Sequence, residues 1–134
     1  MQAQPYLFFE GRCEEALNFY REAIGAEVTA LLRYSESPDP STVEPGMAEK
    51  VMHANLTIGD TQVMASDGRM QETASFRGFA LTLTVADLAE AERCFQALAD
   101  GAEVGMPLSQ TFWSPAFGML TDRFGVMWMV MVPA

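Results

Sequence analysis

The chain has 134 residues, a length that suits one compact domain and leaves little room for a second. Apolar residues make up 49% of it and charged residues 19%, which is typical of a globular protein and excludes a disordered chain. The formal net charge of −10 disfavours nucleic acid and anionic membranes as partners. The apolar runs are too short to span a bilayer, and the first residues lack the pattern of a secretion signal, so we expect a cytoplasmic protein without membrane association.

The first 70 residues predict a strand, a helix and three further strands. An extended apolar segment at 5–9 precedes a stretch in which apolar residues recur every three or four positions, as on one face of a helix. These residues are Cys13, Ala16, Leu17, Tyr20, Ala23 and Ile24. Gly25 supplies the left-handed conformation that commonly ends a helix. Strand-like stretches follow at 27–34, 51–58 and 61–67.

The segment SESPDPSTVEPGMAEK, residues 35–50, separates the first two of these strands. It holds three prolines and shows no apolar periodicity, so we interpret it as a surface loop. A loop of this length inside a compact domain is often functional. We therefore consider it a candidate lid over a binding site.

The second half of the chain repeats the first. EALNFYREAIGAEV at 15–28 is similar to EAERCFQALADGAEV at 90–104, and an extended segment at 79–85 precedes the second copy. Asp87 and Glu90 form a capping-box-like helix start, Gly101 is expected to end that helix, and strands are predicted at 104–112, 116–122 and 125–132. The expected fold is α+β, with two βαβββ repeats at about 1–70 and 76–134 inside a single domain, 1–134.

Alternation along the strands predicts which residues face away from the helices. In VMHANLTI, Met52, Ala54, Leu56 and Ile58 oppose His53, Asn55 and Thr57. In FALTLTV, Phe79, Leu81, Leu83 and Val85 oppose Ala80, Thr82 and Thr84. In the final apolar strip, Trp128, Val130 and Val132 should pack on a helix while Met127, Met129 and Met131 face away from it. The second face is mildly polar but uncharged, so we expect it to line a partly enclosed cavity.

Three residues stand out as candidates for chemistry or binding. His53 is the single histidine and suits acid–base work, although a lone histidine on a sheet is more often a structural, hydrogen-bonded residue. Asn55 could orient a carbonyl or hydroxyl group of a ligand, or it could make local hydrogen bonds to loops. Trp113 lies in a predicted loop, where it could wall a binding site or be buried in a dimer contact. Cys13 and Cys94 have no metal-binding spacing and are expected to be buried free thiols.

The motifs PYLFFEGRCEEALNFY (5–20), KVMHANLTIGDTQVMASD (50–67) and MPLSQTFWSPAFGMLTDRFGVMWMV (106–130) resemble the PhnB-like group of the vicinal-oxygen-chelate superfamily, which includes glyoxalases, bleomycin-resistance proteins and dioxygenases. The resemblance covers nearly the whole chain. It implies a homodimer whose concave sheets form cavities, with helices on the outer face. The group is sometimes labelled as 3-demethylubiquinone methyltransferases, but the sequence has no glycine-rich loop for adenosylmethionine.

The resemblance also locates the positions at which related proteins bind a metal ion. They fall at Pro5, Asn55, Ala80 and Met129, of which three cannot serve as transition-metal ligands of the usual kind. A register shift of two would bring in Gln4 or His53. We therefore expect no metal and no cofactor.

Three functions remain open from the sequence. The leading hypothesis is a metal-independent protein that binds a small, partly apolar ligand between His53, Asn55 and the methionine-rich last strand, with Thr82, Trp113, Met127 and Met129 as further contacts. The alternative is an isomerase, lyase or dioxygenase that uses His53 or an unexpected divalent metal. The third is a scaffold whose concavity is filled by its own side chains. The fold does not decide among them.

Overall fold

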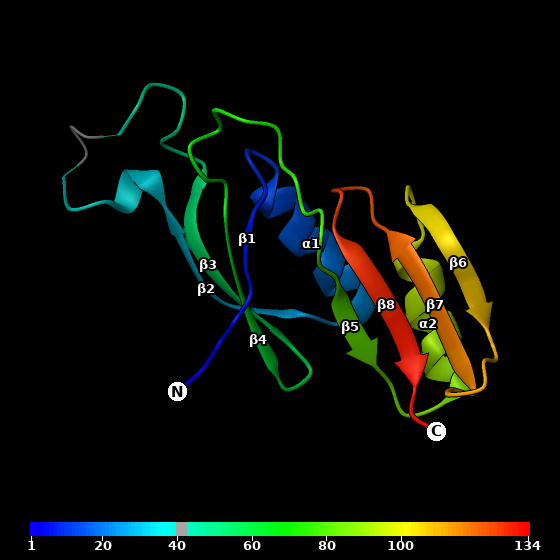
Figure 1. The fold of residues 1–134 in the computed structure, drawn as a ribbon. Helices are drawn as coiled ribbons and strands as arrows, with labels where there is room; N and C mark the ends of the chain where they lie inside the picture. Colours follow the sequence, from blue (N-terminus) through cyan, green and yellow to red (C-terminus); the bar gives the residue numbers. More distant parts are fainter. Residues whose placement is uncertain (40–42) are drawn as a thin grey trace. The chain divides into compact units, whose positions relative to one another are not determined.

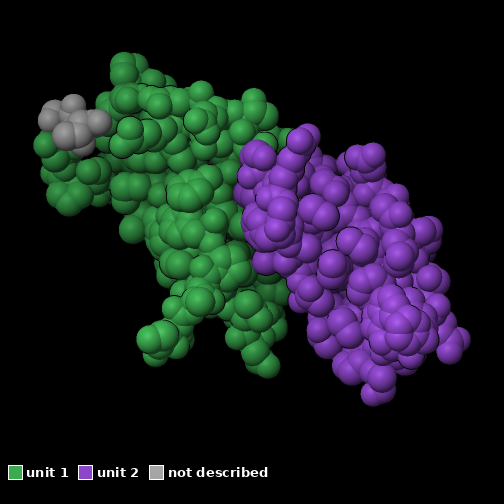
Figure 2. Space-filling model, in the orientation of Figure 1, with its two compact units in different colours: residues 1–74 green, residues 75–134 purple. Residues whose placement is uncertain are grey.

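The computed structural model describes residues 1–39 and 43–134. It divides the chain into two compact units, Met1–Ala74 and Ser75–Ala134 (Figure 2). Each unit holds one helix and one four-stranded mixed sheet, which confirms the predicted α+β class. That the two units form a single domain stays a prediction.

Unit 1 has the element order βαβββ (Figure 1). Its elements are β1 (Tyr6–Phe8), α1 (Cys13–Ile24), β2 (Glu27–Arg33), β3 (Val51–Ile58) and β4 (Thr61–Ser66), with a 3₁₀ turn at Tyr34–Glu36. The sheet order is β1-β4-β3-β2. β1 runs parallel to β4, while the pairs β4–β3 and β3–β2 are antiparallel.

Unit 2 repeats this topology. Its elements are β5 (Leu81–Thr84), α2 (Leu88–Leu98), β6 (Glu103–Ser109), β7 (Ala116–Thr121) and β8 (Met127–Val132). The sheet order β5-β8-β7-β6 has a parallel β5–β8 pair and two antiparallel pairs, as in unit 1. Because β1 and β5 occupy the same place in the two sheets, the internal repeat of the sequence corresponds to one repeated supersecondary unit.

The helix boundaries follow their capping residues. Gly25, with φ of 69°, ends α1 as predicted. At the start of α2, the Asp87 carboxylate accepts a hydrogen bond from the Glu90 amide at 2.9 Å. The prediction that Gly101 ends α2 is wrong: the helix ends at Leu98, and Ala99, whose amide donates to the Phe95 carbonyl, is the C-cap. Gly101 lies beyond the cap, where its φ of 78° turns the chain toward β6.

A bulge changes the predicted alternation of β3. Ala54, Leu56 and Ile58 are buried as expected, but Met52 is not on their side of the sheet. Leu32 pairs with His53 and Arg33 with Val51, so Met52 is an extra residue in the ladder. Because Val51 takes the buried position, Met52 and His53 lie together, half-buried, on the face away from α1.

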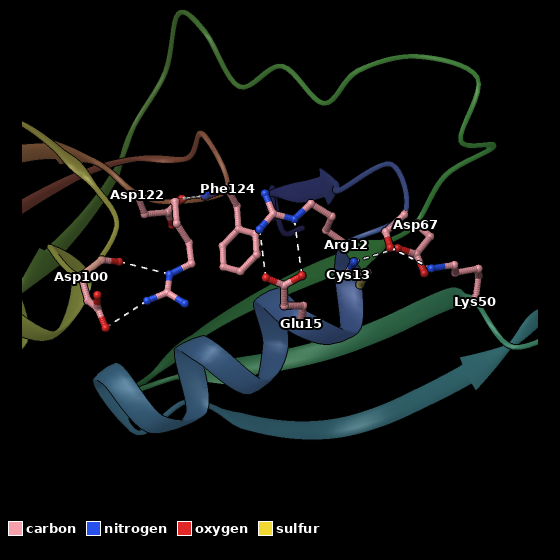
Figure 3. A network of polar contacts seen from close by, with 10 residues as sticks. Arg12, Cys13, Glu15, Lys50, Asp67, Asp100, Asp122 and Phe124 are labelled. Atoms are coloured by element: carbon pink, nitrogen blue, oxygen red, sulfur yellow. Dashed lines mark hydrogen bonds and ion pairs between the residues drawn. The ribbon is translucent and has the colours of Figure 1, made fainter.

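The bulge is held by a buried carboxylate. Asp67 is 1% exposed, and its two oxygens accept hydrogen bonds from the Cys13 and Val51 amides, each at 2.7 Å (Figure 3). The Asp67 amide in turn donates to the Val51 carbonyl at 2.8 Å. Asp67 therefore joins the start of α1 to the start of β3, a larger role than the turn residue that the sequence suggests.

The last strand has the predicted two faces. Trp128, Val130 and Val132 are buried on the side that packs on α2, whereas the three alternate methionines are half-buried on the other side. β7 lies close beneath α2 at Gly118, where a Cβ atom would come within 2.7 Å of the Phe95 ring. A glycine is needed there because the helix and the strand approach closely.

Two further expectations concern the thiols and membranes. Cys13 and Cys94 are free and buried, as predicted. No helix within residues 1–39 and 43–134 is long and apolar enough to cross a membrane.

Candidate functional site

A chain of hydrogen bonds crosses the face of the unit 1 sheet that points away from α1. The Tyr6 hydroxyl lies 2.8 Å from Nδ1 of His53, and Nε2 of His53 lies 2.9 Å from Oδ1 of Asn55. All three side chains are half-buried. The structure thus brings together His53 and Asn55, two of the predicted site residues, and adds Tyr6.

This arrangement occupies both nitrogens of the His53 ring. A neutral imidazole has one donor and one acceptor nitrogen, so Tyr6 can donate to Nδ1 while the Nε2–H donates to Asn55. The Asn55 amide group is then left with its two N–H donors for another partner. The Tyr6–His53–Asn55 chain therefore offers a neutral set of donors and acceptors, with no ring nitrogen spare to act as a base.

Tyr6 is held in its neutral form. Desolvation by burial raises the pKa of the Tyr6 phenol, against a smaller lowering by a hydrogen bond from Ser66. The hydroxyl therefore stays protonated at neutral pH and can donate to His53. The alternation of the segment at 5–9 contains a signal for Tyr6, because Leu7 and Phe9 are buried and Tyr6 and Phe8 are not.

Apolar side chains surround these polar groups. Phe8 is 50% exposed and stacks on Tyr6 with ring centroids 4.8 Å apart. Met64 is the cross-strand neighbour of Tyr6 on one side and of Asn55 on the other. Leu32, 44% exposed, pairs with His53. A molecule lying on this face would meet apolar surface with a few fixed polar groups, the usual chemistry of a ligand site.

Unit 2 places methionines in the equivalent row of its sheet. Thr82 pairs with Met129, Met129 with Met119, and Met119 with Met106, across all four strands. The Thr82 hydroxyl donates to the Met129 sulfur at 3.8 Å. Met127 lies on the same face as Met129, two residues earlier on β8. This methionine face takes the position that the Tyr6–Met64–Asn55 row has in unit 1.

Trp113 rests on the rim of the unit 2 sheet. It is 44% exposed, and its ring meets Phe117 edge to face at 5.4 Å and Phe112 at 4.8 Å. Phe117 is the cross-strand partner of Met131, so the aromatic group borders the methionine face. The predicted site residues therefore form two groups, His53 and Asn55 in unit 1 and Thr82, Trp113, Met127 and Met129 in unit 2.

The residues at the metal positions of related proteins do not fit a metal ion. Pro5 and Ala80 have no side-chain donor, the Asn55 oxygen lies against His53, and the Met129 sulfur accepts from Thr82. No group of three or more His, Cys, Asp or Glu side chains in the described part of the chain could hold a metal. Carboxylate and imidazole clusters of the kind that bind zinc or iron are thus missing from the described residues.

The sequence matches known proteins over nearly its whole length. Residues 1–131 match the family described as 3-demethylubiquinone-9 3-methyltransferase. Protein YjdN of Escherichia coli K12 is 35% identical over 142 aligned positions, which cover 98% of this chain and 95% of that protein. Protein PA1353 of Pseudomonas aeruginosa has a solved structure that is 42% identical, with a TM-score of 0.88 over 99% of this chain and 98% of that one. A PhnB protein from Bacillus cereus is 30% identical, with a TM-score of 0.81 over 98% and 99% of the two chains.

More distant structures share the fold alone. A glyoxalase-related enzyme from Fulvimarina pelagi is 16% identical, with a TM-score of 0.65 over 98% of this chain and 87% of that chain. The paired βαβββ units are therefore those of the glyoxalase/bleomycin-resistance fold.

Proposed function

Because this chain belongs to the PhnB-like family, within the glyoxalase/bleomycin-resistance superfamily, we propose that it is a metal-independent protein that binds a small, partly apolar molecule. The ligand contacts the Tyr6–His53–Asn55 chain through one of its polar groups. The observation that carries this proposal is the pairing of both His53 nitrogens, at 2.8 and 2.9 Å, on a sheet face that also presents the apolar side chains of Phe8, Met64 and Leu32.

The polar groups of this face suit recognition better than catalysis. A general base needs a nitrogen within reach of the substrate proton. His53 would have to break a hydrogen bond to Tyr6 or Asn55 to supply one. The side-chain N–H groups of Asn55, by contrast, have no hydrogen-bond partner among residues 1–39 and 43–134, so a carbonyl or hydroxyl oxygen of a ligand can accept from them without any rearrangement.

The methionine face of unit 2 is the second surface on which we propose ligand contacts. Thr82, Met127, Met129 and Trp113 are its members among the predicted site residues. Methionine side chains adapt their shape because they are unbranched and polarisable, so such a surface accepts apolar groups of varied outline. This property supports a binding role for the strip that ends the chain.

The family's description as a methyltransferase is not part of this proposal. A methyltransferase needs a site for adenosylmethionine, and the sequence of 134 residues contains no glycine-rich loop of the dinucleotide or phosphate type that could form one. Metal independence rests on the poor donor set at Pro5, Asn55, Ala80 and Met129.

Native mass spectrometry of protein purified without chelators or a metal-affinity column tests the proposal. We expect an organic adduct on the wild-type protein and no stoichiometric metal. Asn55→Ala and His53→Ala should reduce its occupancy by about tenfold, since each removes hydrogen bonds to the ligand or to the group that orients it. Asn18→Ala is the matched control, because Asn18 is exposed on α1.

The other outcomes separate the alternatives. One metal ion per subunit would contradict metal independence and would favour an isomerase, lyase or dioxygenase. Loss of turnover in His53→Ala, with ligand occupancy unchanged, would also identify an enzyme. A bare protein mass in every sample would support the scaffold hypothesis.

A further inference from the structure

A cavity of about 390 Å³ opens beside the bulge of β3 in unit 1. We call it the methionine pocket; its lining residues are Tyr34, Ser37, Val43, Glu44, Met47, Met52 and Arg69. Its volume lies in the range of small-molecule sites. Met52 brings the pocket next to the proposed site, because the bulge leaves Met52 and His53 side by side on the same face of the sheet.

Hydrogen bonds on two sides hold the walls of the pocket in place. The Tyr34 hydroxyl donates to the Gly68 carbonyl at 2.7 Å, which fixes the aromatic ring across the end of the sheet. Met47 is only 6% exposed, and its carbonyl accepts from the Lys50 amide at 2.9 Å. Met47 belongs to the predicted surface loop at 35–50, so part of that loop is anchored. The candidate-lid prediction also includes residues 40–42, which lie outside the described residues.

One cation stands at the edge of this cavity, whose lining mixes polar and apolar side chains. Arg69 has no ion pair within the described part of the chain, although it also borders a second cavity of about 280 Å³ whose wall carries Glu10 and Glu72. The Glu10 carboxylate is engaged by the Met70 amide at 2.9 Å. Arg69 is therefore available to a ligand, and its planar guanidinium matches a carboxylate.

The acidic neighbours restrict the charge of the head group. Glu44 lines the methionine pocket, and Glu10 and Glu72 line the second cavity that Arg69 borders. A dianion such as a phosphate would meet repulsion from these carboxylates, whereas a monoanion would meet less. The combination of one guanidinium with the apolar side chains of Val43, Met47 and Met52 thus favours a carboxylate with an apolar chain.

We infer that the ligand is an amphipathic carboxylate, with its acid group on Arg69 and its chain against Met47, Met52 and Tyr34. This inference rests on the proposed function and adds the chemical class of the ligand. Arg69 acts as a specificity-determining residue, and the methionine pocket extends the polar face at His53.

Three probes with the same alkyl chain test the inference: octanoate, 1-octanol and octylamine. We would titrate each into protein labelled with ¹³C at the methionine methyl groups, assigned by Met→Leu substitutions, and measure affinity by calorimetry. Octanoate should bind most tightly and shift the Met47 and Met52 resonances but not Met106, which lies on β6. Arg69→Gln should weaken octanoate about tenfold and leave 1-octanol unchanged.

Two further variants sharpen the test. Glu44→Gln should strengthen octanoate binding, because it removes a like charge from the pocket. Arg77→Gln, at an exposed arginine outside the pocket, makes the same charge change as Arg69→Gln and should have no effect. Circular dichroism of each variant would show that it is folded.

Several results would overturn the inference. Tighter binding of octylamine, an equal effect of Arg69→Gln and Arg77→Gln, or no binding of any probe would each exclude the amphipathic carboxylate. Octanoate shifts at Met64 that disappear in His53→Ala, with Met47 and Met52 unmoved, would place binding on the sheet face alone. In that case the proposed function stands and the methionine pocket is wrong.

Discussion

At the scale of single residues, buried carboxylates organise the turns of both units. Asp122 is 4% exposed, and its Oδ1 accepts from the Phe124 amide at 2.8 Å (Figure 3) and from the Val126 amide at 3.1 Å. Its Oδ2 accepts from the Trp128 indole at 2.9 Å. The carboxylate thus accepts hydrogen bonds both from backbone amides of the β7–β8 turn and from Trp128, the largest fully buried side chain.

Asp122→Ala should be strongly destabilising. It would remove the acceptor of the hydrogen bonds that the Phe124 and Val126 amides and the Trp128 indole donate, and each such loss costs about 1–3 kcal/mol. We expect the free energy of unfolding in urea to fall by roughly 3 kcal/mol or more. Asp60→Ala is the control, because Asp60 is exposed in the corresponding β3–β4 turn. A similar loss in both variants would contradict this role of Asp122.

The thiol of Cys13 is predicted to be inert in the folded protein. Burial, and then the charges of Asp67 and Glu14, raise the pKa of Cys13 from 9.0 to about 12. At pH 8 we expect iodoacetamide to leave Cys13 unmodified in native Cys94→Ala protein and to modify it in urea. Rapid labelling of Cys13 in the native protein would contradict this prediction, because it would show that the start of α1 unfolds locally and exposes the thiol.

The same shift sets the sign of a pH effect. The folded-state pKa lies above the unfolded one, so this thiol's contribution to stability is complete below pH 9.0 and is lost as the pH rises toward about 12. Burial also raises the pKa of Cys94, which acts in the same direction. Alkaline conditions should therefore favour unfolding.

At the scale of elements, close packing of a helix on a strand explains Gly118. A Cβ atom there would lie 2.7 Å from the Phe95 ring, closer than such atoms approach, and 3.1 Å from the Leu108 backbone, which is a tight contact. Neither neighbour can simply move aside, because one is a buried aromatic ring and the other is backbone. β7 can lie under α2 only where this position has no side chain.

Gly118→Ala should lower the free energy of unfolding by about 1–3 kcal/mol, because overpacking shifts the ring or the strand. Gly105→Ala is the control on the neighbouring strand, since its nearest contact would be at 3.9 Å. Thermal unfolding of both variants gives the comparison. Phe95→Leu should partly rescue Gly118→Ala by making room, and the absence of any rescue would contradict the steric explanation.

The bulge of β3 is the element-scale feature that shapes the candidate site. Regular alternation would bury Met52 and expose Val51; the extra residue reverses this and brings Met52 and His53 to one face. The methionine pocket and the Tyr6–His53–Asn55 chain are adjacent only for this reason.

At the scale of the whole molecule, one supersecondary unit is used twice with different surface chemistry. The row Tyr6–Met64–Asn55 in unit 1 corresponds to Thr82–Met129–Met119 in unit 2. Duplication keeps the buried faces alike, because both must cover a helix, while the opposite faces are free to differ. The homodimer implied by the family resemblance stays a prediction, which the mass in the native spectrum also tests.

The sequence by itself determined the order of the elements and, apart from Met52 at the bulge, the faces of β3 and β8. Apolar residues recur at three- and four-residue spacing from Cys13 to Ile24, and they alternate along the last strand. Both patterns reflect local backbone geometry, which is the same in every helix or strand and can be read from neighbouring residues. These patterns predicted both helices, the repeated βαβββ order and the outward position of His53, Asn55 and Met129.

The tertiary structure decided how distant residues meet. Tyr6 reaches His53 from 47 positions away, Asp67 joins Cys13 to Val51, and Met47 is buried although its loop has no periodic pattern. Each of these contacts depends on strand register and loop closure. Local propensity does not encode them, because a shift of one residue in the ladder exchanges the two faces of a strand.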